Sequence, residues 1–227
     1  MNGLLSLVST PIGNLQDTTL RAIKTFSQAD LIACEDTRVT GVLLKAHGIS
    51  SKHFLSIHHH TPDHALSELI EKIHNGLRVA YASDAGTPGV NDPGGRLVEL
   101  AYEAGIHIEV IPGPSALTAA ISACGFPMEH FSYIGFIPQK NHRRATFVSI
   151  AERKEPTIFF ESTHRILKTL NELSASLQGE RLIYVGRELT KKFETHLRAP
   201  ITDVIAHLEK SSIKGEFTVI VGPVRLK

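Results

Sequence analysis

Short apolar runs alternate along the first half of the chain with stretches in which apolar residues recur every three or four positions. The runs predict strands at 4–9, 30–34, 53–57, 77–82 and 106–111. The periodic stretches predict helices at 17–28, 37–47, 94–104 and 115–124, and a further helical stripe is formed by Leu66, Leu69, Ile70 and Ile73. Strands that alternate with helices are typical of βαβ units, so we expect an α/β fold with a mainly parallel N-terminal sheet.

The pattern changes after Gly125-Phe126-Pro127, the best candidate for a domain boundary. We therefore expect two domains, residues 1–124 and residues 125–227. The second half predicts strands near 131–137, 156–160, 181–187 and 216–221, and helices near 141–152, 163–177 and 200–210. Its strands are longer and alternate more, which favours a mixed C-terminal sheet.

Composition excludes several classes of protein. The 227 residues are 42% hydrophobic and 21% charged, so the chain can bury a core and is neither disordered nor a coiled coil. No apolar run approaches the length of a membrane span, and no basic region of a secretory signal precedes the first one. Two cysteines cannot build a disulfide framework or a cysteine zinc site, and we expect a reducing, cytoplasmic location. A net charge of +1 requires that any nucleic-acid contact use a local basic patch.

Three loops rich in glycine and proline each follow a predicted strand, at 10–15, 83–95 and 111–116. Ligands of open α/β sheets bind beyond the carboxyl ends of the strands, and glycines there let backbone amides approach a ligand. Asp84 could accept hydrogen bonds from a ribose or an amino group. Tight turns, with Ser115 as a helix cap, explain the same residues equally well. Because no P-loop and no GxGxxG opens a helix, we expect a nucleoside-like ligand without a polyphosphate.

Charged residues gather at three predicted strand ends, 35–38, 161–165 and 187–192, and in one basic run, Lys140, His142, Arg143 and Arg144. Strand-end charges are a hint of function, and the basic run would suit a phosphate backbone. Salt bridges along the rim of a sheet would explain the strand-end charges equally well. A solvent-exposed helix start would explain the basic run. Three consecutive histidines, 58–60, alternate in direction along an extended segment, which favours an exposed loop over a metal site.

Seven segments occur in a fixed order: TPIGNL at 10–15, ACEDTR at 33–38, SDAGTPGVNDPG at 83–94, IPGPSA at 111–116, FESTHR at 160–165, RELTKKFE at 187–194 and KGEF at 214–217. Together they resemble the bacterial ribosomal RNA small subunit methyltransferase I family over essentially the whole chain. Its members methylate the ribose 2′-hydroxyl of a cytidine in 16S rRNA. The resemblance implies a two-domain tetrapyrrole-methylase-like (class III methyltransferase) fold that holds S-adenosyl-methionine between the domains. It also implies a homodimer whose partner is 16S rRNA in the 30S subunit.

The resemblance extends to site residues. Cofactor contacts are expected from Pro11, Gly13, Asp84, Gly86, Thr87, Pro88, Gly89, Gly113, Ser115, Ala116, Phe160, Leu189 and Phe217. RNA contacts are expected from Arg21, Arg38, Lys140, Arg143, Arg144, Arg165 and Lys191. A ribose hydroxyl reacts more readily when a base accepts its proton. The candidate bases are Glu35, Asp36, Glu161 and Glu188, among which the sequence does not choose.

Two other functions fit parts of the sequence. An enzyme of the same fold that acts on a small molecule, such as a tetrapyrrole, would methylate a soluble acceptor and not 30S subunits. A non-catalytic RNA-binding assembly factor would bind RNA without methyl transfer. The near-neutral charge argues against strong affinity for naked RNA and favours a folded ribosomal particle as the substrate.

Overall fold

The computed structural model describes residues 3–50, 52–177 and 181–224. The chain separates into two compact units, Met1–Ser115 and Ala116–Lys227. The boundary expected at 124/125 falls at the end of helix α5 (Ala116–Cys124), which packs against strands of the second unit. This packing places the whole helix in the C-terminal unit.

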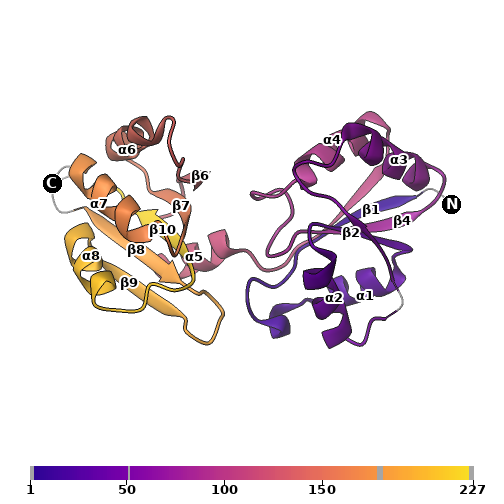
Figure 1. Ribbon diagram of the computed structural model, residues 1–227, viewed down its shortest axis with the longest axis horizontal. Coiled ribbons are helices and arrows are strands. Elements are labelled where there is room, and N and C mark those ends of the chain that lie inside the picture. Colours follow the sequence, from indigo (N-terminus) through magenta and orange to yellow (C-terminus); the bar gives the residue numbers. More distant parts are fainter. Residues whose placement is uncertain (1–2, 51, 178–180, 225–227) are drawn as a thin grey trace. The chain divides into compact units, whose positions relative to one another are not determined.

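The N-terminal unit contains a five-stranded sheet in which every pairing is parallel, as predicted (Figure 1). Its strands are β1 (Leu4–Val8), β2 (Leu31–Cys34), β3 (His53–Ser56), β4 (Arg78–Ala82) and β5 (His107–Ile111), in the order β3-β2-β4-β1-β5. The connections contain the short 3₁₀ turn η1 (Leu15–Asp17) and helices α1 (Leu20–Gln28), α2 (Thr37–Ala46), α3 (Asp63–His74) and α4 (Gly94–Glu103). Each of the predicted strands and helices is present, with ends shifted by up to a few residues.

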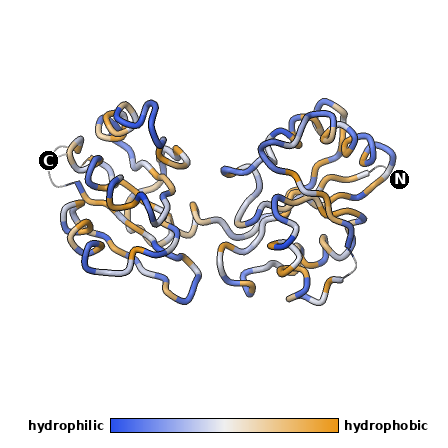
Figure 2. The backbone as a smooth tube through the Cα atoms, viewed as in Figure 1, coloured by the Kyte–Doolittle hydropathy of each residue, from blue (hydrophilic) through white to orange (hydrophobic). Residues whose placement is uncertain are grey.

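Helices cover both faces of this sheet. Val79 and Tyr81 of β4 pack in a cluster with residues of α3 and α4, whereas the alternate residues Ala80 and Ala82 pack with residues of α1 and α2. Strand β4 is therefore buried on both sides, which is the usual condition of a strand inside a parallel sheet. Figure 2 shows apolar residues concentrated along the strands and hydrophilic residues along the outer surfaces of the helices.

The C-terminal unit contains a mixed sheet, also as predicted. Its strands are β6 (Ser132–Phe136), β7 (Thr157–Ser162), β8 (Leu182–Arg187), β9 (Thr195–Pro200) and β10 (Glu216–Val221), in the order β6-β7-β10-β8-β9. Strands β6 and β7 are parallel and the other pairs are antiparallel. Helices α6 (Arg143–Glu152), α7 (Ile166–Ser176) and α8 (Ile201–Glu209) share one core with the sheet. Helix α5 packs on β8 and β10.

Strand β9 is absent from the elements that the sequence pattern predicts. It is an edge strand paired only with β8, and none of its residues is buried. Leu197 and Ala199 alternate with His196 and Arg198 and pack against the edge of the core, but this apolar pattern is too short to predict a strand by itself. No helix within the described residues is long and apolar enough to span a membrane.

Candidate active site

Three loops meet at the carboxyl edge of the N-terminal sheet. Strand β1 lies between β4 and β5 in the sheet, and all three strands are parallel, so the loops that follow them leave from the same edge. These loops are residues 9–14, 83–93 and 112–115. The three loops rich in glycine and proline therefore share one edge of the sheet.

Hydrogen bonds join the three loops directly. Thr10 and Gly86 form a two-way backbone bridge, with N–H···O distances of 2.9 and 3.1 Å. The Ser9 hydroxyl donates to Thr87 Oγ1 at 3.2 Å, and the Thr87 hydroxyl donates to the Pro114 carbonyl at 3.1 Å. Thr87 therefore links both neighbouring loops to its own. These hydrogen bonds join the three loops into one unit.

Gly86 shows why this edge needs glycine. Its φ is +84°, a backbone conformation that side-chain-bearing residues rarely adopt. A Cβ placed there would lie 3.4 Å from Ile12 Cγ2, an ordinary contact, so the backbone conformation and not space is the constraint. The bridge to Thr10 consequently depends on a residue without a side chain.

Asp92 organises the second half of the 83–93 loop. One carboxylate oxygen accepts from the amides of Gly89 and Val90, at 2.6 and 3.0 Å. The other accepts from the amide of Gly94 at 2.7 Å and from the Tyr81 hydroxyl at 3.1 Å. Burial, followed by the charge of Asp92, raises the pKa of the Tyr81 hydroxyl, so this group remains a donor. Sequence reasoning missed Asp92, although an Asp two residues before a glycine in a turn is the usual sign of such a bond.

Acidic side chains join the ends of two neighbouring strands, β2 and β4. The backbone amide of Asp36 donates to Asp84 Oδ1 at 2.9 Å, and the amide of Asp84 donates to Glu35 Oε1 at 3.3 Å. Burial raises the pKa of Glu35, the hydrogen bond from Asp84 opposes this, and the nearby charges of Asp84 and Asp92 raise it further. The charge of His59 acts in the opposite direction, and none of the described ion pairs involves Glu35.

Asp36 has a different environment. Its carboxylate caps helix α2 by accepting from the Arg38 amide at 2.8 Å, and it forms an ion pair with the Arg38 guanidinium at 2.6 Å. The hydrogen bond from Arg38 lowers the pKa of Asp36 to about 2. Such a carboxylate is a poor proton acceptor near neutral pH.

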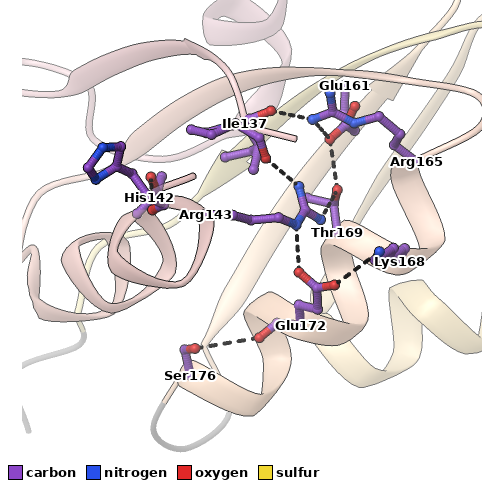
Figure 3. Close-up of polar contacts among 11 residues, drawn as sticks. Ile137, His142, Arg143, Glu161, Arg165, Lys168, Thr169, Glu172 and Ser176 are labelled. Atoms are coloured by element: carbon purple, nitrogen blue, oxygen red, sulfur yellow. Dashed lines mark hydrogen bonds and ion pairs between the residues drawn. The ribbon is translucent and has the colours of Figure 1, made fainter. Parts of the chain in front are cut away.

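In the C-terminal unit, Glu161 lies in a buried polar network on β7 and α7 (Figure 3). One of its oxygens accepts from Thr169 Oγ1 at 2.7 Å and pairs with Arg165 at 2.9 Å. The other accepts from the Ser162 amide at 2.8 Å. With 1% of its surface exposed, Glu161 is positioned to hold the unit together rather than to meet a substrate.

Arg143 completes this network from helix α6 (Figure 3). Its guanidinium pairs with Glu172 at 2.6 Å and donates to Thr169 Oγ1 at 2.9 Å and to the Pro138 carbonyl at 3.0 Å. Arg165 donates to the neighbouring carbonyl of Ile137. Both arginines were expected at RNA, but their side chains anchor the connection between β6 and α6, and Arg143 is only 9% exposed.

Three of the seven segments meet at the end of the C-terminal sheet where β7 and β8 finish and β10 begins. They are the segments at 160–165, 187–194 and 214–217. Lys191 forms ion pairs with Glu188 at 3.0 Å and with Glu216 at 2.9 Å, while Thr163 Oγ1 bonds both the amide and the carbonyl of Gly215. Burial opposes ionisation of Glu188, but the hydrogen bond from Lys191 prevails and lowers the pKa. Gly215 has a φ of +124°, and a Cβ there would lie 2.4 Å from Glu188 Cγ.

The other predicted RNA contacts lie mostly at the surface. Arg21 is exposed and donates to the Val110 carbonyl at 2.6 Å, and Arg38 has 89% of its side chain exposed. Lys140 and Arg144 are exposed in the basic run that contains the buried Arg143. These exposed cations are the members of the predicted set that an RNA can reach without rearrangement.

The residues predicted to contact the cofactor fall into two groups. One group lies on the three joined loops or directly after them: Pro11, Gly13, Asp84, Gly86, Thr87, Pro88, Gly89, Gly113, Ser115 and Ala116. The other group lies in the C-terminal unit, where Leu189 and Phe217 are 6% and 2% exposed and Phe160 is half-buried. Phe217 packs in the hydrophobic core of that unit. Cofactor contact by either group stays a prediction.

The fold and the loops define a class of enzyme. The family described as Tetrapyrrole (Corrin/Porphyrin) Methylases matches residues 4–205. A solved diphthine synthase has a TM-score of 0.77 at 14% identity and covers 99% of this chain and 91% of its own. A cobalt precorrin-4 methyltransferase has a TM-score of 0.71 at 17% identity, with coverages of 96% and 94%. The protein is a methyltransferase with the tetrapyrrole methylase fold.

Curated relatives narrow the class. Ribosomal RNA small subunit methyltransferase I of Thermotoga maritima is 40% identical over 218 residues, which are 96% of this chain and 97% of the relative. The protein of the same name in Haemophilus influenzae is 44% identical over 224 residues, 97% of this chain and 79% of that protein. The chain belongs to the ribosomal RNA small subunit methyltransferase I family, which confirms the resemblance carried by the seven segments.

Proposed function

We propose that this methyltransferase transfers a methyl group from S-adenosyl-methionine to the ribose 2′-hydroxyl of a cytidine in 16S rRNA, within the 30S subunit. The observation that carries the substrate is the 40% identity to a named ribosomal RNA methyltransferase over nearly the whole of both chains. The structures at 14% and 17% identity support the fold alone, so they do not favour a tetrapyrrole as the acceptor.

The joined loops of the N-terminal unit fit the cofactor. The exposed carboxylate of Asp84, one oxygen of which accepts from the Asp36 amide, can accept further hydrogen bonds from ribose hydroxyls. When bound, S-adenosyl-methionine supplies a methyl group made electrophilic by a positive sulfur. The negative charges of Glu35, Asp84 and Asp92 favour a cation at this edge. The predicted residues thus match the chemistry of this cofactor.

Glu35 is our proposed proton acceptor for the ribose hydroxyl. Of the four candidate bases, Asp36 and Glu188 are paired with cations that lower their pKa, and Glu161 is enclosed in the network of Figure 3. Glu35 lies beside Asp84 on the edge that would hold the cofactor, and its pKa is raised. A raised pKa makes a carboxylate a stronger base.

The experiment that tests the function uses 30S subunits that lack the modification, a labelled methyl donor and the full chain. We expect label on the 2′-oxygen of one cytidine of 16S rRNA, located by nuclease mapping. Transfer to a tetrapyrrole and not to 30S subunits would identify the small-molecule enzyme instead. Binding to 30S subunits without any transfer would identify an assembly factor. Sedimentation of the purified chain would test the predicted homodimer.

A further inference from the structure

A groove of about 330 Å³ lies between strand β6 and helix α6 of the C-terminal unit. One wall comes from the end of β6 and the loop after it, including Phe136 and Pro138. The other comes from one face of α6, including Ser149, with His142 before the helix and Arg153 after it. We call this feature the β6–α6 groove. Nothing in the proposed active site uses it.

The loop after β6, which forms one wall of the groove, is hydrogen-bonded to the buried network of Figure 3. Arg143 holds the Pro138 carbonyl, and Arg165 holds the carbonyl of Ile137. Arg143 is in turn paired with Glu172 at 2.6 Å. Two ion-paired arginines thus anchor this loop at two consecutive carbonyls, which favours the shape of the groove seen in the structure.

The groove combines an aromatic ring with positive charge. Phe136 is 53% exposed although it is a large apolar residue, and its ring packs edge-on against Phe160 at a centroid distance of 5.8 Å. Arg153 lines the groove, and the nearby residues Lys140, Arg144 and Lys154 are exposed, whereas Arg143 is buried and paired with Glu172. Exposed aromatic rings beside positive groups are the usual elements of a single-stranded nucleic-acid site.

We propose that the β6–α6 groove binds one unpaired nucleotide of the RNA substrate. The base stacks on Phe136, the sugar faces the hydroxyl of Ser149, and Arg153 binds the adjoining phosphate. The exposed residues Lys140 and Arg144 follow the backbone on either side. The volume is near the lower end of ligand pockets, about 300–1,000 Å³, which suits a nucleotide and excludes a duplex. The proposal rests on RNA being the substrate, as proposed above, and adds how the enzyme holds it.

Two variants and matched controls test the groove in the full chain. Phe136→Ala removes the stacking ring and Arg153→Gln removes the phosphate contact, whereas Phe136→Tyr keeps the ring. Val148→Ala shortens an exposed apolar residue of the same helix outside the groove, and Lys210→Gln removes a charge at the end of helix α8. Each is assayed for methyl transfer to 30S subunits, for cofactor affinity by calorimetry, and for binding of a fluorescein-labelled single-stranded RNA.

The Phe136→Ala variant loses the stacking of one base. Its KM for 30S subunits should rise, and its affinity for the labelled RNA should fall by about 5- to 150-fold. The kcat and cofactor affinity should stay unchanged, Phe136→Tyr should retain RNA binding, and both controls should match the wild type. Arg153→Gln should reduce the slope of log affinity against log salt by about 1.

The proposal is overturned if Phe136→Ala and Arg153→Gln leave both the KM and the labelled-RNA affinity unchanged. A loss for 30S subunits with none for the labelled RNA would also overturn it, because the groove would then contact a ribosomal protein. If the wild-type chain transfers no methyl group to 30S subunits, the proposed function fails. The labelled-RNA measurement would still decide the groove.

Discussion

Replacing Asp92 by asparagine should loosen the cofactor loop without unfolding the protein. Asparagine has nearly the shape of aspartate, but one of its two terminal groups is an NH₂ donor. In the structure each carboxylate oxygen of Asp92 accepts from two donors. Whichever way the new amide turns, its NH₂ group faces either the amides of Gly89 and Val90 or the amide of Gly94 and the Tyr81 hydroxyl.

The size of the effect follows from these contacts. A hydrogen bond to a charged group contributes about 1.5–3 kcal/mol. The Asp92→Asn variant would lose two of them if its NH₂ faces Gly89 and Val90. If the NH₂ faces Gly94, the Tyr81 hydroxyl can turn to accept from it, so one bond is lost and the others no longer end on a charge. Because Asp92 is only half-buried, we take the lower value for each bond, about 3 kcal/mol in total. If this free energy keeps the loop in its binding conformation, the dissociation constant for S-adenosyl-methionine should rise about 100-fold. Tyr81→Phe loses a single bond, about 1.5 kcal/mol on the same scale, and should raise the dissociation constant about tenfold.

Calorimetric titration of S-adenosyl-methionine into the Asp92→Asn and Tyr81→Phe variants checks this, with thermal unfolding measured in parallel. The matched control is Asp63→Asn, which makes the same change at an exposed carboxylate paired with Arg96 at the start of α3. It should bind the cofactor normally. The reasoning is refuted if folded Asp92→Asn protein binds S-adenosyl-methionine as tightly as the wild type.

Three further variants probe the other acidic residues. Asp84→Ala should abolish cofactor binding, and calorimetry that finds unchanged affinity in a folded variant rules out its assignment. Glu35→Gln should slow methyl transfer about 100-fold or more. Because the folded-state pKa of Glu35 is raised above 4.5, the wild-type rate should rise and the stability fall as the pH passes upward from 4.5 through that pKa. The Glu35→Gln variant should show neither trend when the rate and the melting temperature are measured as functions of pH. Glu161→Gln should lower the free energy of unfolding by about 3–5 kcal/mol, measured in urea, and equal stability with lost activity would restore Glu161 as a catalytic candidate.

The types of the elements follow from the local sequence. The apolar runs at 77–82 and 106–111 become β4 and β5 because buried strands need apolar residues on both faces. The stripe of Leu66, Leu69, Ile70 and Ile73 becomes the buried face of α3. In contrast, β9 pairs its backbone with β8 and places only Leu197 and Ala199 against the core, so its local apolar pattern is too short to predict a strand.

The three loops were visible in the sequence, but their contacts were not. Glycine and proline marked each loop, because these residues have special backbone conformations. That Thr10 bonds Gly86, and that Thr87 reaches Pro114, depends on β1 lying between β4 and β5. Strand order joins residues far apart along the chain, and no local period encodes it.

Charged residues show most clearly what the sequence determines and what only the tertiary structure determines. The sequence by itself determined the α/β class, the parallel and mixed sheets, the loops that follow β1, β4 and β5, and the family. Only the tertiary structure decided that Asp92 holds a loop, that Arg143 and Glu161 are enclosed in one network, and that Glu35 takes part in none of the described ion pairs. The physical reason is that the free energy of a charge depends on burial and on its nearest partner, and both are set by packing between distant segments.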